Sequence, residues 1–275
     1  MDKQLVTYKD LGVINYKTAW DYQESLLQQN VKIKMARGKG LLNIEQAASH
    51  NNEVLQGKDH PVPLINESII PVSPAAVNAL NTTNYLLLCE HPPVYTLGKS
   101  GHPENILISE QEMERQGIQF YKTNRGGDIT FHGPQQVVGY PIIDLENFYT
   151  DIGRYLRELE EVIMLTLAEY DIHGERSKGE TGVWIQPGVP GKERKICAMG
   201  VRCSRWITMH GFALNVNTDL GYFNNIIPCG IENKKVASIE TELQQVVPLQ
   251  DVKERIQRNF EKVFNAKLLY PGDKG

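Results

Sequence analysis

Short apolar runs that follow one another closely are the feature that most constrains the fold of this chain. The run at 85–90 is compact and ends at His91-Pro92-Pro93, which is typical of a buried strand. Strands so close in sequence favour a mixed, largely antiparallel sheet flanked by helices, an α/β fold of the α+β type, over strict strand–helix alternation. Further strands are predicted at 118–122, 137–143, 182–186, 195–203 and 206–216.

Apolar side chains at helical spacing predict three helices. They cover residues 14–31, 152–170 and 252–263. From about 36 to 84 the chain is rich in polar residues and prolines, with only short apolar clusters. We expect one catalytic domain over residues 1–275, with an insertion or irregular excursion at about 36–84.

Composition excludes several classes of function. The formal net charge is −4 and there is no basic run, so nothing favours nucleic acid or a membrane surface as a partner. The first residues lack the apolar stretch of a secretion signal, so we expect a cytoplasmic protein. None of the four cysteines forms a C-x-x-C pair, and the histidines have no metal-ligand spacing, so we assign no metal.

Two adjacent glycines mark the first candidate site, Arg125-Gly-Gly-Asp-Ile-Thr-Phe-His-Gly-Pro134. Such a pair lets the backbone pass close to a ligand and leaves N–H groups to point at it. The segment is neither a Walker loop nor a dinucleotide fingerprint. The alternative is an ordinary glycine turn before a strand at 129–131.

Lys195 begins the second candidate segment, Lys195-Ile-Cys-Ala-Met-Gly200. In a regular strand, alternation places Lys195, Cys197, Met199 and Val201 on one face. A lysine on an apolar face forms an ion pair, is partly solvent-exposed or has a depressed pKa, and the last two states suit catalysis. The alternative, which the pattern alone favours, is a surface lysine beside the charged turn at 192–194.

Cys229 lies in the third candidate segment, Ile227-Pro-Cys-Gly230. Proline and glycine on either side favour a tight bend with an accessible thiol, as a nucleophile requires. The competing interpretation is a small buried thiol. The pattern alone does not rank Cys229 above Cys197, which shares a predicted strand face with Lys195.

Taken together, the segments resemble the lipoyl(octanoyl)transferase family. The order and separations of the motifs match along most of the chain, outside about 36–84. The matching segments are Asp10-Leu-Gly-Val-Ile-Asn-Tyr16, Glu90-His-Pro-Pro-Val-Tyr-Thr-Leu-Gly98, the glycine segment at 125–134, Thr181-Gly-Val-Trp184, the lysine segment at 195–200, His210-Gly-Phe-Ala-Leu-Asn-Val-Asn217 and Pro228-Cys-Gly230.

The resemblance implies a fold like that of biotin and lipoate ligases and an acyltransferase activity without a cofactor. Octanoyl would pass from octanoyl-acyl carrier protein to a specific lysine of a lipoyl domain, the first step of endogenous protein lipoylation. The implied catalytic residues are Cys229, which forms the thioester intermediate, and Lys195. The implied substrate contacts are Arg125, Gly126, Gly127, Asp128, Ile129, Thr130, Phe131, His132, Ala198, Met199, Gly200, Gly211, Phe212 and Ala213.

The implied acceptors are the lipoyl domains of 2-oxoacid dehydrogenase E2 subunits and the glycine-cleavage H protein. Rival interpretations are an ATP-dependent lipoate- or biotin-protein ligase, a non-catalytic acyl-carrier-binding protein, and an amidotransferase acting between lipoyl domains. Two departures from the family pattern stand out. Gln135 replaces the usual glycine after His-Gly-Pro, and the excursion at 36–84 is longer than expected.

Overall fold

A mixed sheet of eight strands forms the centre of the computed structural model, which describes residues 3–39, 81–227 and 235–273. Within these residues the strand order is β10-β8-β9-β6-β2-β1-β11, with β7 beside β8. The strands are β1 (Gln4–Val13), β2 (Asn84–Glu90), β6 (Gln136–Ile142), β7 (Val183–Ile185), β8 (Arg194–Ser204), β9 (Ile207–Asn215), β10 (Lys235–Val236) and β11 (Ala266–Leu269).

The sheet pairs strands in both directions. β2, β6, β9, β8 and β7 are joined in series by antiparallel pairing. β1 is parallel to both β2 and β11, and β10 is parallel to β8. The predicted mixed sheet is therefore confirmed, but in its antiparallel part only β7, β8 and β9 are close in sequence, whereas β2–β6 and β6–β9 are long-range pairs.

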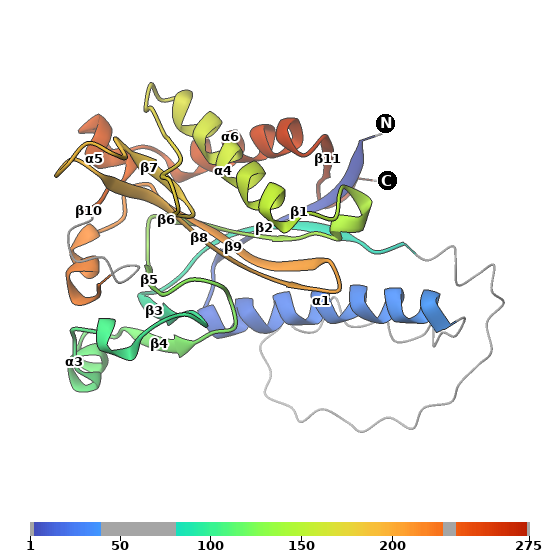
Figure 1. Cartoon of the computed structure of the whole chain (residues 1–275), viewed down its shortest axis with the longest axis horizontal. Coiled ribbons are helices and arrows are strands. Elements are labelled where there is room, and N and C mark those ends of the chain that lie inside the picture. Colours follow the sequence, from blue (N-terminus) through green and yellow to red (C-terminus); the bar gives the residue numbers. More distant parts are fainter. Residues whose placement is uncertain (1–2, 40–80, 228–234, 274–275) are drawn as a thin grey trace.

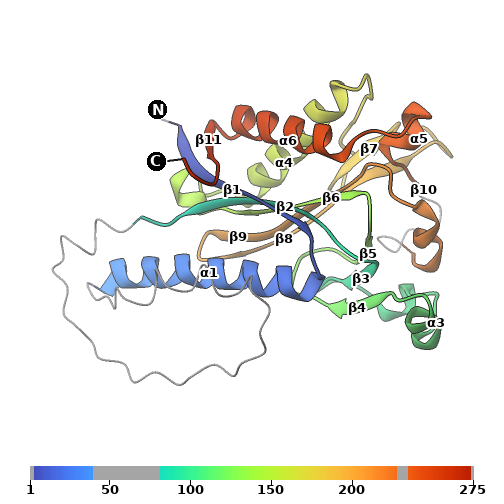
Figure 2. The same cartoon turned by 180° about the vertical axis from the view of Figure 1, so that it is seen from behind.

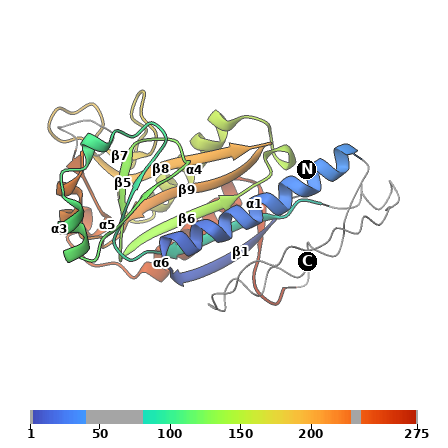
Figure 3. The ribbon, with the colours of Figure 1, turned by 90° about the horizontal axis from the view of Figure 1, so that it is seen from below.

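Helices cover both faces of this sheet, as Figures 1 and 2 show. On one face lie α4 (Ile152–Ala168) and α6 (Leu249–Val263), whose Tyr155, Leu159 and Phe260 join a buried core with the sheet. The short α5 (Ile239–Leu243) adds Ile239 to the same core. On the other face α1 (Tyr16–Lys39) runs along the sheet (Figure 3), and its Leu26 is fully buried in a second core.

A second, smaller sheet lies beside the N-terminal end of α1 (Figure 1). Its order is β4-β3-β5, and its core includes side chains from the short elements around it. The strands and the short elements around them are β3 (Val94–Leu97), β4 (Gln119–Lys122), β5 (Ile129–His132), η2 (Pro103–Asn105), α3 (Glu110–Arg115) and η4 (Leu220–Asn225). A further short helix, η3 (Leu145–Asn147), lies beside the large sheet.

The predicted strands and helices are all present, and apart from the end of α1 their ends lie within three residues of the prediction. α1 continues to Lys39, so the first residues of the predicted excursion are helical, and residues 40–80 lie outside the described part of the chain. The sequence prediction missed β1, β3, β10 and β11, which are short or alternate weakly. No helix among the described residues is both long and apolar enough to span a membrane.

Candidate active site

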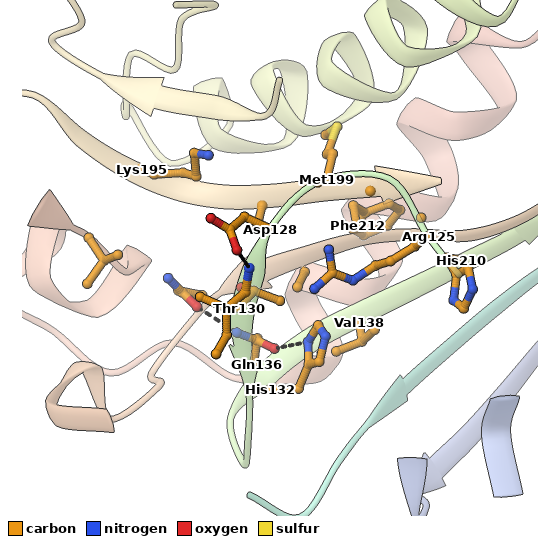
Figure 4. Close-up of a pocket in the computed structure, with 18 of the residues that line it drawn as sticks. Arg125, Asp128, Thr130, His132, Gln136, Val138, Lys195, Met199, His210 and Phe212 are labelled. Carbon is orange, nitrogen blue, oxygen red and sulfur yellow. Dashed lines mark hydrogen bonds between the residues drawn. The ribbon is translucent and has the colours of Figure 1, made fainter. Parts of the chain in front are cut away.

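A cavity of about 910 Å³, part of it open to solvent, lies where the large sheet meets the 125–132 segment (Figure 4). Ala198 lies opposite Ala213, and Gly200 opposite Gly211, in the antiparallel register of β8 and β9. Directly opposite residues share a face, and all four line the cavity. Because these side chains are so small, the strands form a flat floor with room above it.

Most of the substrate contacts predicted from the resemblance meet in this one cavity. Gly126 and Phe131 do not line it. The Gly126 N–H donates to the carbonyl of Val201, 3.0 Å away, and the Phe131 ring stacks on Tyr222 in the core of the small sheet. The predicted residues that line it are Arg125, Gly127, Asp128, Ile129, Thr130, His132, Ala198, Met199, Gly200, Gly211, Phe212 and Ala213.

The glycine segment is held against β3 of the small sheet by the buried side chain of Arg125. Its Nη2 donates to the carbonyl oxygen of Thr96 at 2.6 Å and to Thr96 Oγ1 at 2.9 Å. The segment also lies directly on β8, because a Cβ at Gly200 would stand 2.7 Å from the carbonyl oxygen of Gly126. Glycine at 200 is therefore required for this close approach.

Asp128 ties the same segment to η2. Its Oδ2 accepts a 2.6 Å hydrogen bond from Asn105 Nδ2, and its Oδ1 accepts from the backbone N–H of Ile129 at 2.7 Å. The carbonyl of Asn105 in turn accepts from the N–H of Ile227 at 2.8 Å. The backbone that leads toward Cys229 is thus fixed beside the cavity, while Cys229 itself is outside the described residues.

Polar side chains that the sequence prediction missed form one wall of the cavity. Gln136 Nε2 donates to Asn215 Oδ1 at 2.8 Å and to the Phe131 carbonyl at 3.2 Å, so its Oε1 accepts from His132 Nδ1 at 3.0 Å. Burial, with the nearby Arg125 adding to it, holds the pKa of His132 well below 6.5, so the ring is neutral. Gln136 shares a face of β6 with Val138 and Tyr140, and this two-residue period was the signal that could have placed it here.

A second buried pair is formed by Tyr140, which lines the cavity, and His91, which does not. His91 Nδ1 lies 2.7 Å from the carbonyl of Ile14, which only accepts, so Nδ1 carries the proton. His91 Nε2 then accepts from the Tyr140 hydroxyl at 2.7 Å. Burial lowers the pKa of His91 to about 4, consistent with a neutral ring whose tautomer is set by these two partners.

Lys195 reaches the cavity because the β7–β8 register shifts by one residue at this point. Val183 pairs with Cys197 and Trp184 pairs with Lys195, which leaves Ile196 as an extra residue on β8. Cys197 faces the buried core, whereas Lys195 and Trp184 line the cavity. The predicted placement of Lys195 and Cys197 on one face is therefore wrong, because a bulge re-aims one of them.

The cysteines of the described residues differ in environment. Cys89 and Cys197 are fully buried, and burial raises the pKa of both thiols. Cys203 is exposed near the turn between β8 and β9. Among these thiols none combines exposure with a place on the cavity, so the nucleophile predicted at Cys229 has no rival in the described residues.

His210 is a further cavity residue with an unusual backbone. Its φ is +58° inside β9, a region that L-residues rarely adopt. Its Nε2 is 2.9 Å from Asn124 Oδ1, and burial together with Arg125 lowers its pKa to about 3. Among the described residues, no three His, Cys, Asp or Glu side chains are grouped so that they could hold a metal ion.

Comparison with known proteins places this architecture in a family. A family model for the lipoyl protein ligase A/B catalytic domain matches residues 75–261, a segment that contains nearly the whole cavity. The chain belongs to this family.

Its relatives in the lipoyl protein ligase A/B family include proteins of similar length. An octanoyltransferase of Christiangramia forsetii is 49% identical over 271 residues, 98% of this chain and 100% of that protein. An octanoyltransferase of Flavobacterium psychrophilum is 50% identical over 265 residues, 96% of this chain and 98% of that protein.

Solved structures confirm the expected ligase-like fold. A lipoate-protein ligase A bound with ATP has a TM-score of 0.59 at 12% identity, covering 98% of this chain and 89% of that one. The bi-partite lipoate protein ligase of Thermoplasma acidophilum has a TM-score of 0.59 at 14% identity, covering 98% and 87%. At such low identity these likenesses show the fold alone.

The structure also explains one departure from the family pattern. Gln135 has a φ of +62°, a conformation that glycine adopts without strain. In this member of the family the side chain compensates, because Gln135 Oε1 accepts from Asn217 Nδ2 at 2.8 Å. The backbone N–H of Gln135 also donates to Glu90 Oε2 at 2.9 Å. The loop beyond the cavity thus keeps its glycine-type turn with a different residue.

Proposed function

We propose that this chain is an octanoyltransferase that moves octanoyl from octanoyl-acyl carrier protein to a lysine of a lipoyl domain through a thioester on Cys229. The observation that carries the proposal is the cavity itself, which combines a floor of small residues with Lys195. The floor suits an unbranched acyl chain, and near half-identity to octanoyltransferases over almost the full length supports the reaction.

In the first proposed step, the Cys229 thiolate attacks the carbonyl carbon of the donor thioester. A carbon–sulfur bond forms to Cys229, and the bond to the carrier's thiol breaks. The Lys195 ammonium favours the thiolate before attack and gives its proton to the departing carrier thiolate. One thioester replaces another, so the step is nearly balanced in free energy and needs no ATP.

In the second proposed step, the acceptor lysine attacks the acyl-Cys229 carbonyl as a neutral amine. Its carbon–nitrogen bond forms, the bond to Cys229 sulfur breaks, and the excess proton on nitrogen passes to the Lys195 amine. Lys195 is again an ammonium and Cys229 again a thiolate. An amide is more stable than a thioester, which drives the transfer forward.

The proposed acceptors are the lipoyl domains of 2-oxoacid dehydrogenase E2 subunits and the glycine-cleavage H protein, with the cytoplasm as the compartment. Membership of the lipoyl protein ligase A/B family, together with the octanoyltransferases among its relatives, supports a lipoyl-domain acceptor. The solved Thermoplasma acidophilum lipoylation system pairs a protein of this fold with an E2 lipoyl domain.

Intact-mass measurement after incubation with octanoyl-acyl carrier protein tests the proposal. We expect a single octanoyl adduct that is absent in Cys229→Ala and retained in the matched control Cys197→Ala. Lys195→Ala should form the adduct far more slowly while remaining folded. An adduct that survives in Cys229→Ala would refute the assignment of the nucleophile.

The rival function is an ATP-dependent ligase, which the solved neighbours represent. Transfer of octanoyl to a lipoyl domain from octanoyl-acyl carrier protein without ATP separates the two. Transfer from free octanoate that requires ATP would favour the ligase instead.

A further inference from the structure

We propose that Trp184 is a positioning residue for Lys195, holding its ammonium group over the indole face at the cavity during acyl transfer. The inference rests on the proposed function, in which Lys195 assists the nucleophile. In this inference Trp184 acts by positioning Lys195, and not by contacting the substrate.

The register of β7 and β8 brings the two residues together. Trp184 is paired directly with Lys195, while the neighbouring pair joins Val183 to Cys197. Residues directly opposite in an antiparallel pair have adjacent side chains on one face. The extra residue, Ile196, therefore directs Lys195 toward Trp184 and away from the core in which Cys197 is buried.

The contact has the geometry of a cation–π interaction. Lys195 Nζ lies 4.6 Å from the centroid of the Trp184 ring. Tryptophan is the most favourable partner for such a contact, and the attraction grows when the site is desolvated. Trp184 is 1% exposed and Lys195 is half-buried, so the contact is largely shielded from bulk water.

Backbone hydrogen bonds and close packing fix the position of the residue that carries the indole. The N–H of Trp184 donates to the carbonyl of Glu175 at 2.9 Å, and the N–H of Glu175 donates back to the carbonyl of Trp184 at 2.8 Å. Two residues earlier, Gly182 has a φ of +112°, and a Cβ there would stand 2.5 Å from the carbonyl oxygen of Cys197. This packing sets the distance between β7 and the bulge on β8.

A buried carboxylate on α4 holds the start of β7 in place. Glu160 is fully buried, and its Oε1 accepts from the N–H of Gly182 at 3.0 Å. Its other oxygen, Oε2, pairs with Arg176 at 3.0 Å and with Arg157 at 2.8 Å. The strand that carries Trp184 is thus anchored to the helix layer, and the indole has a fixed place from which to hold a flexible lysine.

Holding Lys195 matters for the proposed chemistry. A lysine has a flexible four-carbon stem, and its ammonium must stay near the reacting sulfur to donate a proton. The indole face attracts the charged form, which the first step uses. Asp128 and Lys235 also line the cavity, so it holds an acidic and a basic side chain besides Lys195.

Graded fluorination of the indole at position 184 tests the inference. Each added fluorine weakens the negative face of the ring while barely changing its shape. The readout is the single-turnover rate of adduct formation from octanoyl-acyl carrier protein, with the full chain. We expect a stepwise decrease that reaches about tenfold for the most fluorinated indole. A residue needed only for packing would give a flat series.

Two controls make the result specific. The same analogues at Trp206, 38% exposed at the turn between β8 and β9, should leave the rate unchanged. In a Lys195→Ala background the residual rate should not depend on fluorination at 184. A flat series on an active enzyme, or an equal decrease without Lys195, overturns the inference alone. Absence of any adduct on the wild-type chain overturns the proposed function, and the inference with it.

Discussion

Ala198 and Ala213 face each other across β8 and β9, and both line the floor of the cavity. Ala198 lies three residues beyond Lys195, which is about 10 Å along a strand. If the acyl carbonyl is held near Lys195 and the chain runs along β8, the terminal carbons of an extended octanoyl chain lie over this alanine pair. The pair is therefore placed to limit the length of the acyl chain.

Replacing Ala198 with leucine should shorten the acyl chain that the enzyme accepts. The added isobutyl group fills space above the floor, so the rate with octanoyl should fall by about tenfold or more, since one or two displaced methylenes cost roughly 1–3 kcal/mol. The rate with butanoyl or hexanoyl should fall less. Competition between carrier-bound acyl groups of different length measures this ratio.

The matched control is Cys203→Leu, an exposed position on the same strand. It should leave the octanoyl-to-hexanoyl preference unchanged. An unaltered preference in Ala198→Leu would show that the chain takes another path through the cavity.

Gln135 provides a test of backbone strain. A β-branched residue at a positive φ is costly, and Gln135→Val also loses the hydrogen bond from Asn217. We expect Gln135→Val to lower the free energy of unfolding by about 2 kcal/mol. Gln135→Gly loses the same hydrogen bond but relieves the backbone strain, so it should lower the free energy of unfolding by only about 1 kcal/mol. Urea denaturation measures both, and equal losses would contradict the strain argument.

Local patterning predicted the parts of the fold that consist of regular, buried runs. β2 and β6 are buried runs that are mostly apolar, and α4 carries a clear apolar stripe, so both kinds of element could be placed from sequence. β1 was missed because, beyond Val6, Tyr8 and the half-buried Leu11, its residues are polar or exposed. Its strand conformation depends on pairing with β2 and β11, which are distant in sequence.

In the candidate site, too, some residues could be predicted from the sequence and others could not. The family resemblance, and not the local pattern, pointed to Arg125, Lys195 and the small residues of the floor, since the pattern alone favoured a surface lysine at 195. The bulge at Ile196 could not be predicted, since it depends on how β7 aligns with β8. The partnership of Gln136 with His132 was also hidden, because a hydrogen bond between two buried side chains leaves no periodic signal.

The buried histidines predict a loss of stability in mild acid. Burial lowers the pKa of His91 to about 4 and that of His210 to about 3, from an ordinary 6.5. Below pH 6.5 the unfolded chain therefore binds protons that the folded chain does not, so the free energy of unfolding decreases as pH falls toward 4. The expected slope is about 1.4 kcal/mol per pH unit for each such histidine. Urea denaturation from pH 7.5 to 4.5 measures it.

Single histidine variants show which imidazole ring causes this dependence of the free energy of unfolding on pH. His91→Gln should make the decrease between pH 6 and 4.5 less steep, whatever it does to stability at neutral pH. His173→Gln, which replaces an exposed ring, should leave the slope unchanged. A slope that is the same in His91→Gln as in the parent would mean that His91 does not stay neutral in the folded protein.

Thiol reactivity should follow burial. Alkylation requires a thiolate that the reagent can reach, and burial both shields Cys89 and Cys197 and raises their pKa. In the folded protein a small alkylating reagent should therefore label the exposed Cys203 and leave these two unmodified, while all four cysteines react in denaturant. Peptide mapping by mass spectrometry identifies each site.

If Cys229 is the nucleophile, it should also be labelled, and prior incubation with octanoyl-acyl carrier protein should protect it while Cys203 still reacts. Rapid native labelling of Cys197 would contradict its burial in the core and reopen its competition with Cys229.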